Sequence, residues 1–228
     1  MNKVTLTGIL LTALTVASCG NGAKSPDNNQ TQAATEVAKT DSASKKIVLF
    51  FGDSLTAGYG LDDPADAFPG VIGRRVDSLK LPYKVINAGL SGETTAGGNG
   101  RINWLLKQKI DIFVLELGAN DGLRGIPVNE TAKNLQSIVD KVKAKYPDAK
   151  LVLLGMQVPP NMGADYTGKF KNVFPNLAAK NKMKLVPFLL QGVAGIPSLN
   201  QGDGIHPTAQ GAKIAANNVW EVLKDDLK

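Results

Sequence analysis

Apolar and polar residues alternate in blocks along most of this chain. Short apolar runs, each bounded by Gly, Pro or charged residues, predict five strands at residues 47–51, 83–86, 110–117, 151–154 and 185–188. Continuous apolar runs of this length are typical of strands that are buried on both faces of a parallel sheet.

Amphipathic segments lie between and after these runs. Apolar residues at helical spacing predict helices over residues 69–79, 103–109, 131–146, 166–181 and 208–227. Pro69 suits a first helical turn, Thr208 can serve as an N-cap, and Pro147 ends the third helix. Because strand and helix alternate, the pattern predicts an α/β fold, a three-layer α/β/α sandwich with a mainly parallel sheet of about five strands.

The first 46 residues do not follow this pattern. Residues 1–18 combine Lys3 with an apolar stretch too short and too Thr-rich to span a bilayer, which indicates a secretory signal. The polar segment 19–46 lacks aromatic residues and predicts a disordered tether. The remaining residues, 47–228, suit one domain with a substantial core.

The end of the signal, Val-Ala-Ser-Cys at residues 16–19, resembles a bacterial lipobox. That resemblance implies cleavage before Cys19 and a lipid anchor on it, so that the exported protein is held at a membrane. Gly20, and not Asp, follows the cysteine, which resembles the sorting pattern of Gram-negative outer-membrane lipoproteins. That resemblance implies that the protein is anchored to the outer membrane, facing the periplasm or the cell surface. The alternative is an ordinary signal with an incidental cysteine, which would leave an unpaired thiol on an exported protein.

Composition excludes several classes of function. The formal charge is +6, but the lysines are scattered and not interleaved with aromatic residues, so nucleic-acid binding has no support. We interpret the charge as a solvated basic surface, with unspecific attraction to anionic surfaces as the alternative. One His and one Cys leave no zinc site of the usual kind, and neither a P-loop nor a dinucleotide fingerprint is present. We therefore expect no metal and no cofactor, while the oligomeric state stays open.

Polar, Gly-rich strings follow the first three predicted strands, and a further one precedes the last helix. They occupy residues 52–55, 87–93, 118–121 and 203–207. Because ligands of open α/β sheets bind at the carboxyl ends of the strands, we expect these strings to meet at one edge. His206 is the only histidine, hence the only imidazole that can exchange a proton near neutral pH, and Asp203 can hold its ring in one tautomer. Each string alone could equally be a turn or a helix cap.

Together these strings resemble the SGNH, or GDSL-type, hydrolase family over roughly residues 47–224. The matching blocks are GDSLTAGY at 52–59, GLSGET at 89–94, LGANDGLRG at 117–125 and DGIHP at 203–207. The third block resembles the exported thioesterase-I, lysophospholipase and arylesterase subgroup, and GMQVPPN at 155–161 resembles its arylesterase members. The resemblance implies a flavodoxin-like SGNH hydrolase fold.

The resemblance also implies a role for each site residue. Ser54 would be the nucleophile, His206 its general base, and Asp203 the acid that orients the imidazole. The backbone N–H groups of Ser54 and Gly92 and the side-chain amide of Asn120 would form the oxyanion hole. No GxSxG string is present, which disfavours the nucleophile elbow of α/β-hydrolases.

The acidic residues and loops next to these strings are not expected to take part in the reaction directly. We interpret Asp53 as structural and Asp121 as a loop brace, and assign no role to Glu93 or Glu116. Two loops, 122–126 and 158–166, are expected to border the acyl pocket through Leu123, Ile126, Pro159, Pro160 and Met162.

These features predict a serine esterase that hydrolyses carboxylic esters or thioesters through an acyl-enzyme. Expected substrates are small aryl, short-to-medium acyl or lysophospholipid esters. The alternatives are a carbohydrate O-deacetylase of the same fold and, more remotely, a non-catalytic lipoprotein that binds lipids or glycans.

Overall fold

A computed structural model describes residues 44–228 of the chain. The expected signal peptide, the lipidation site Cys19 and the tether up to residue 43 lie outside the described residues. The first strand begins at Lys46, at the end of the segment expected to be a tether.

The five predicted strands form one parallel sheet in the order β2-β1-β3-β4-β5. Their bounds are β1 Lys46–Gly52, β2 Tyr83–Gly89, β3 Ile112–Leu115, β4 Lys150–Leu154 and β5 Lys184–Val186. This is the flavodoxin-like order, in which the chain reverses direction across the sheet next to β1 and β3. The predicted architecture is confirmed.

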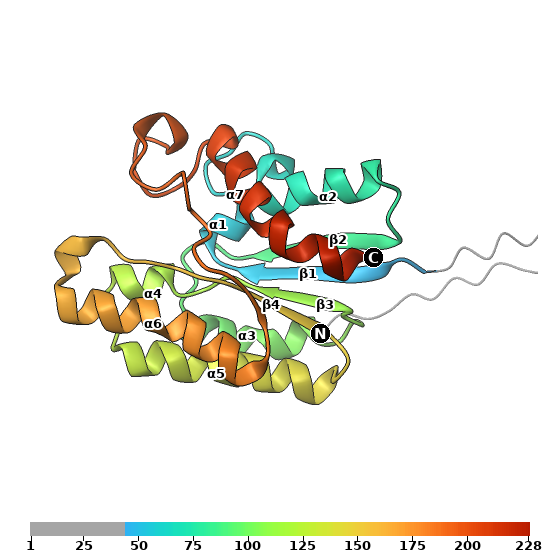
Figure 1. Ribbon diagram of the computed structural model, residues 1–228, viewed down its shortest axis with the longest axis horizontal. Coiled ribbons are helices and arrows are strands. Elements are labelled where there is room, and N and C mark those ends of the chain that lie inside the picture. Colours follow the sequence, from blue (N-terminus) through green and yellow to red (C-terminus); the bar gives the residue numbers. More distant parts are fainter. Residues whose placement is uncertain (1–43) are drawn as a thin grey trace, which may run out of the picture. The chain divides into compact units, whose positions relative to one another are not determined.

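Helices cover both faces of this sheet (Figure 1). Helices α2 (Phe68–Ser78) and α7 (Ala209–Leu223) lie on one face, and α3 (Thr95–Leu105), α5 (Val128–Lys145) and α6 (Ala164–Asn181) lie on the other. Two short helices, α1 (Ser54–Ala57) and α4 (Ala119–Leu123), lie at the carboxyl ends of the strands. Four 3₁₀ turns complete the elements: η1 Pro64–Asp66, η2 Pro160–Met162, η3 Pro197–Leu199 and η4 Lys224–Leu227.

The core lies on the central strands. Residues 48–52 of β1 and all of β3 are buried, with Phe51 packed on Phe113 at a ring-centroid distance of 5.9 Å. Strand β2 is an edge strand with only Tyr83 fully buried, so the expectation of burial on both faces is wrong for β2. Its Val85 and Ile86 are covered partially, which the apolar run alone did not reveal.

The prediction for helix 103–109 is wrong in position. The helix, α3, begins at Thr95, where Thr94 Oγ1 accepts the Gly97 N–H, and it ends at Leu105. Three glycines in its first turns weaken the apolar periodicity that would reveal it. Gly98 is needed there because a Cβ would lie 2.4 Å from the Leu117 side chain.

The other helical predictions hold with small shifts at the ends. Thr208 caps α7 by accepting the Gly211 N–H, and Pro69 lies in the first turn of α2. The predicted last helix divides into α7 and the 3₁₀ turn η4. Within residues 44–228, no helix is both long enough and apolar enough to cross a bilayer.

Candidate active site

The turn after β1 presents Ser54 at the carboxyl edge of the sheet. β1 ends at Gly52, and Asp53 caps α1 by accepting the Leu55 N–H on Oδ1 at 3.0 Å. Gly89, which lies opposite Gly52 in β2, has no room for a side chain: a Cβ there would lie 2.2 Å from the backbone N of Ala57. The close approach of α1 to this strand end therefore requires glycine at position 89.

His206 lies between Ser54 and Asp203. Its Nε2 is 2.9 Å from Ser54 Oγ, and its Nδ1 is 2.6 Å from Asp203 Oδ2. The other carboxylate oxygen, Asp203 Oδ1, accepts the backbone N–H groups of Ile205 and His206 at 2.9 and 3.0 Å. One carboxylate thus fixes both the imidazole and the loop that carries it, in the order that a serine nucleophile and its base require.

These hydrogen bonds also determine the charge of Asp203. The hydrogen bond from the His206 ring, followed by the two backbone N–H groups, lowers the pKa of Asp203 to about 2. Asp203 is therefore ionised throughout the neutral range and is available to stabilise a protonated imidazole.

The loop that carries Asp203 and His206 is attached to the rest of the domain by Gln201 and Tyr59. Gln201 Nε2 donates to the carbonyl oxygens of Tyr59 and Pro207 at 2.7 and 2.9 Å. The Tyr59 ring packs against the imidazole at a centroid distance of 4.7 Å. The His206 ring is thus positioned from its own loop and from the segment after α1.

Two backbone N–H groups near Ser54 are unengaged. Within the described residues, neither the Ser54 N–H nor the Gly92 N–H donates to a protein acceptor. Gly92 has a φ of 79°, in the left-handed region, and is exposed in the turn between β2 and α3. Both N–H groups are therefore available to an oxygen of a bound molecule.

The side chain of Asn120 is held in a single orientation. Its Nδ2 donates to Asp53 Oδ2 and to the Glu93 carbonyl oxygen, both at 3.1 Å. On the opposite side, Arg124 Nη2 donates to Asn120 Oδ1 at 3.5 Å. Because acceptors lie on one side and a donor on the other, the amide cannot be reversed, and a bound oxygen must replace one of the two Nδ2 hydrogen bonds.

The chain is similar to known proteins in sequence and in fold. Residues 50–214 match the model of the GDSL-like lipase/acylhydrolase family.

The chain belongs to this family.

Three relatives of this chain are named as hydrolases of esters or thioesters. The chain is 40% identical over 189 residues to esterase TesA of Pseudomonas aeruginosa, covering 82% of this chain and 92% of that protein. It is 36% identical over 187 residues to an arylesterase of Vibrio mimicus, covering 81% and 91%. It is also 36% identical over 176 residues to thioesterase 1/protease 1/lysophospholipase L1 of Escherichia coli, covering 77% and 82%.

Solved structures are similar in fold as well. The crystal structure of TesA, 40% identical, superposes with a TM-score of 0.76 and covers 80% of this chain and 100% of its own. The psychrotrophic esterase EstA from Pseudoalteromonas sp., in a form inhibited by monoethylphosphonate, is 31% identical with a TM-score of 0.74, covering 79% and 98%. This GDSL-family chain is thus a serine esterase of the SGNH fold that hydrolyses small-molecule carboxylic esters.

Glu116 holds the turn that carries Ser54, a role that the sequence did not reveal. From the end of β3, its Oε2 accepts the backbone N–H of Asp53 at 3.1 Å and the hydroxyl of Thr56 at 2.8 Å. Its Oε1 has no hydrogen-bond partner within the described residues, although the side chain is fully buried. An ionised carboxylate would be costly there, whereas a neutral carboxyl is tolerated.

Asp53 and Glu116 form a buried acidic pair behind Ser54. Burial raises the pKa of Asp53 to about 6, although hydrogen bonds from the Leu55 N–H and the Asn120 amide lower it. Burial raises the pKa of Glu116 well above its ordinary value, and the neighbouring charge of Asp53 raises it further. Burial and the neighbouring acid therefore both disfavour ionisation of Glu116, whereas hydrogen bonds partly offset the effect of burial on Asp53. Asp53 accepts hydrogen bonds only from groups other than His206, in agreement with its structural interpretation.

Glu93 is the second acid whose role the sequence did not reveal. Its carboxylate pairs with both Nε and Nη2 of Arg101, and the half-buried guanidinium also donates from Nη2 to the Ala88 carbonyl oxygen. This pair fixes the turn that contains Gly92. Asp121, predicted as a loop brace, accepts the Thr95 N–H at 2.8 Å and so ties α4 to the start of α3.

The loops expected to border the acyl pocket contact each other. Tyr166 donates to the Ile126 carbonyl oxygen at 2.7 Å, and a Cβ at Gly125 would lie 4.0 Å from the Met162 Cε. Leu123, Pro159 and Pro160 are exposed, whereas Ile126 and Met162 are half-buried. The cavity beside Ser54 and His206 is lined by none of these five residues, and its volume of about 10 Å³ is too small for an acyl chain.

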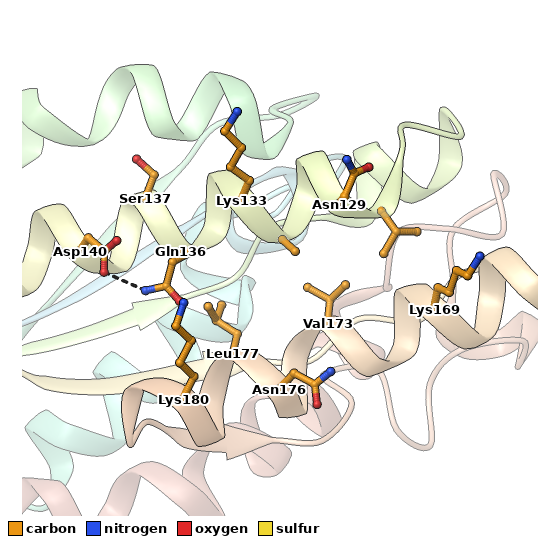
Figure 2. A pocket seen from close by; sticks show the side chains of 12 residues that line it. Asn129, Lys133, Gln136, Ser137, Asp140, Lys169, Val173, Asn176, Leu177 and Lys180 are labelled. Atoms are coloured by element: carbon orange, nitrogen blue, oxygen red, sulfur yellow. Dashed lines mark hydrogen bonds between the residues drawn. The ribbon is translucent and has the colours of Figure 1, made fainter.

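A larger groove lies elsewhere, between α5 and α6 (Figure 2). It has a volume of about 760 Å³, with Val173 and Leu177 between the helices and Lys133, Lys169 and Lys180 along its rim. It contains no residue of the Ser54 site. Within residues 44–228, no group of three or more His, Cys, Asp or Glu side chains is arranged to hold a metal ion.

Proposed function

We propose that Ser54, His206 and Asp203 are the catalytic residues of this esterase. The observation that carries the proposal is the 2.9 Å contact between Ser54 Oγ and His206 Nε2, aligned with the 2.6 Å contact between His206 Nδ1 and Asp203 Oδ2. A serine hydroxyl is a weak nucleophile alone and becomes reactive when an adjacent base removes its proton.

The reaction proceeds through an acyl-enzyme. Ser54 Oγ attacks the ester carbonyl carbon while His206 Nε2 accepts the hydroxyl proton, and ionised Asp203 stabilises the imidazolium. His206 then gives the proton to the leaving alkoxide, which departs as the alcohol. Water, deprotonated by His206, attacks the acyl-Ser54 ester, and the proton returns to Ser54 as the carboxylic acid leaves.

The N–H groups of Ser54 and Gly92 and the Asn120 amide stabilise the tetrahedral oxyanion. The two backbone donors are unengaged, and Asn120 gives up one of its two 3.1 Å hydrogen bonds to make the third. Loss of one such donor typically lowers turnover by about 10²–10³.

We expect a fluorophosphonate to modify the protein once, at Ser54, because its hydroxyl lies against the single imidazole of the chain. The adduct is measured by intact mass and by peptide mapping. The His206→Ala variant should lose labelling, whereas the control Ser78→Ala, at the exposed end of α2, should label like the wild type. A wild-type protein that resists labelling, or that labels at another serine, would contradict the assignment.

For substrates, we propose aryl and short-to-medium acyl esters, with lysophospholipids and acyl thioesters as cellular candidates. The relatives named esterase, arylesterase and thioesterase/lysophospholipase support this choice over a carbohydrate deacetylase. The small cavity beside the catalytic pair supports binding of the acyl group over the exposed loops rather than in an enclosed tunnel.

A series of p-nitrophenyl esters from acetate to decanoate, run beside an acetylated polysaccharide, tests this substrate class. We expect kcat/KM to be highest for a short or medium acyl ester, with little release of acetate from the polysaccharide. Release of acetate faster than hydrolysis of every aryl ester would favour the deacetylase.

We also propose that the esterase is exported and lipid-anchored through Cys19. The polar segment that follows Cys19, up to the start of β1 at Lys46, is the proposed tether. A flexible chain of that length has an r.m.s. span of roughly 25–30 Å, which holds the domain clear of the lipid headgroups. The lipobox-like string supports the anchor, and Gly20 supports the outer membrane, facing the periplasm or the cell surface.

Metabolic labelling with a radioactive fatty acid tests the anchor in a Gram-negative host. The wild type should incorporate label and fractionate with membranes, and Cys19→Ser should do neither. A control variant, Ser25→Ala, changes the same polar segment without removing the thiol and should behave like the wild type. Equal labelling of Cys19→Ser and the wild type would refute the anchor.

A further inference from the structure

Arg124 lies at the rim of the active site with a defined orientation. It follows α4 directly, is exposed, and donates from Nη2 to the Gly92 carbonyl oxygen at 3.1 Å and to Asn120 Oδ1 at 3.5 Å. Gly92 and Asn120 are two of the proposed oxyanion donors, so the guanidinium is held beside the position of the reacting carbonyl.

Most of the donors of this guanidinium are unused. An arginine has five N–H donors, and both contacts of Arg124 come from Nη2. Within residues 44–228, its Nε and Nη1 donate to no protein acceptor and no carboxylate lies within 4.0 Å of it. Arg74 and Arg101, by contrast, are paired with Asp66 and Glu93. A planar fork with free donors suits a carboxylate or a phosphate group.

Apolar side chains surround the same site. The described residues expose seven large hydrophobic side chains, and four of them are adjacent to site residues: Tyr59, Leu90, Leu123 and Ile205. Leu123 precedes Arg124, Leu90 lies in the Gly92 turn, and Tyr59 packs on His206. A substrate that spans this rim therefore meets apolar surface and one fixed positive charge.

We propose that Arg124 binds an anionic group of the ester substrate, a carboxylate or a phosphate, and so selects anionic amphiphilic esters. This inference rests on the proposed function, because the guanidinium acts on the molecule that Ser54 attacks. The competing role is a structural one, in which Arg124 only braces Gly92 and Asn120 and affects all esters equally.

Matched pairs of anionic and neutral esters separate the two roles. The acyl-side pair is the mono-p-nitrophenyl ester of adipic acid against p-nitrophenyl hexanoate, and the alcohol-side pair is hexanoylglycerol phosphate against hexanoylglycerol. The readout is the ratio of kcat/KM for the anionic ester to kcat/KM for the neutral ester, in wild type, Arg124→Gln and Arg124→Lys. The control is Lys143→Gln, which removes one charge near the far end of α5.

We expect Arg124→Gln to lower this ratio about tenfold in at least one pair, Arg124→Lys to retain part of it, and Lys143→Gln to leave it unchanged. The pair that responds identifies the anion as a carboxylate of the acyl group or a phosphate of the alcohol. In the wild type the ratio should fall as salt screens the charge, and this fall should be absent in Arg124→Gln.

An unchanged ratio in both pairs would overturn the proposal, whether or not Arg124→Gln lowers the rates themselves. Equal losses on anionic and neutral esters would assign Arg124 to bracing alone. Failure of the wild type to hydrolyse even the neutral esters would instead overturn the proposed function, and the inference with it.

Discussion

The turn that carries Ser54 is attached to the sheet through the buried side chain of Glu116. Its Oε2 accepts both the Asp53 N–H and the Thr56 hydroxyl, so the end of β3 holds the beginning of α1. Asp53 in turn accepts a hydrogen bond from the Asn120 amide, which links the turn that carries Ser54 to α4. The distances among the site residues therefore depend on one carboxyl group that never contacts the substrate.

The acids of the site differ in charge because their surroundings differ. Asp203 is partly exposed and accepts three hydrogen bonds, which stabilise its ionised form. Glu116 is buried beside another acid with one oxygen unpartnered, which stabilises its neutral form. A permanent negative charge thus lies against His206, whereas burial disfavours a negative charge on the acids behind Ser54. In the proposed mechanism, the first charge stabilises the imidazolium, and a charge behind Ser54 would oppose the developing oxyanion.

The sequence predicted how strands and helices alternate along the chain, and which polar strings lie at the edge of the sheet. These depend on local patterns, namely buried apolar runs, caps such as Thr208, and short strings at strand ends. It placed α3 too far along the chain, because three glycines obscure the periodicity of its first turns. It gave no role to Glu116 or Glu93, because their partners, Thr56 and Arg101 among them, are set by packing between elements. It also could not show that β2 is an edge strand, since strand order is a property of the whole sheet.

Because burial raises the pKa of Glu116, we expect a neutral Glu116 to anchor the turn that carries Ser54. Urea unfolding of the wild type and of Glu116→Gln, which imitates the neutral carboxyl, tests it between about pH 5 and about pH 8. The folded wild type holds a proton that the unfolded chain releases, so wild-type stability should fall relative to the variant by up to about 1.4 kcal/mol for each pH unit, until the raised pKa is reached. A stability difference that does not change with pH would contradict the claim, because Glu116 would then ionise in the folded state as it does in the unfolded chain.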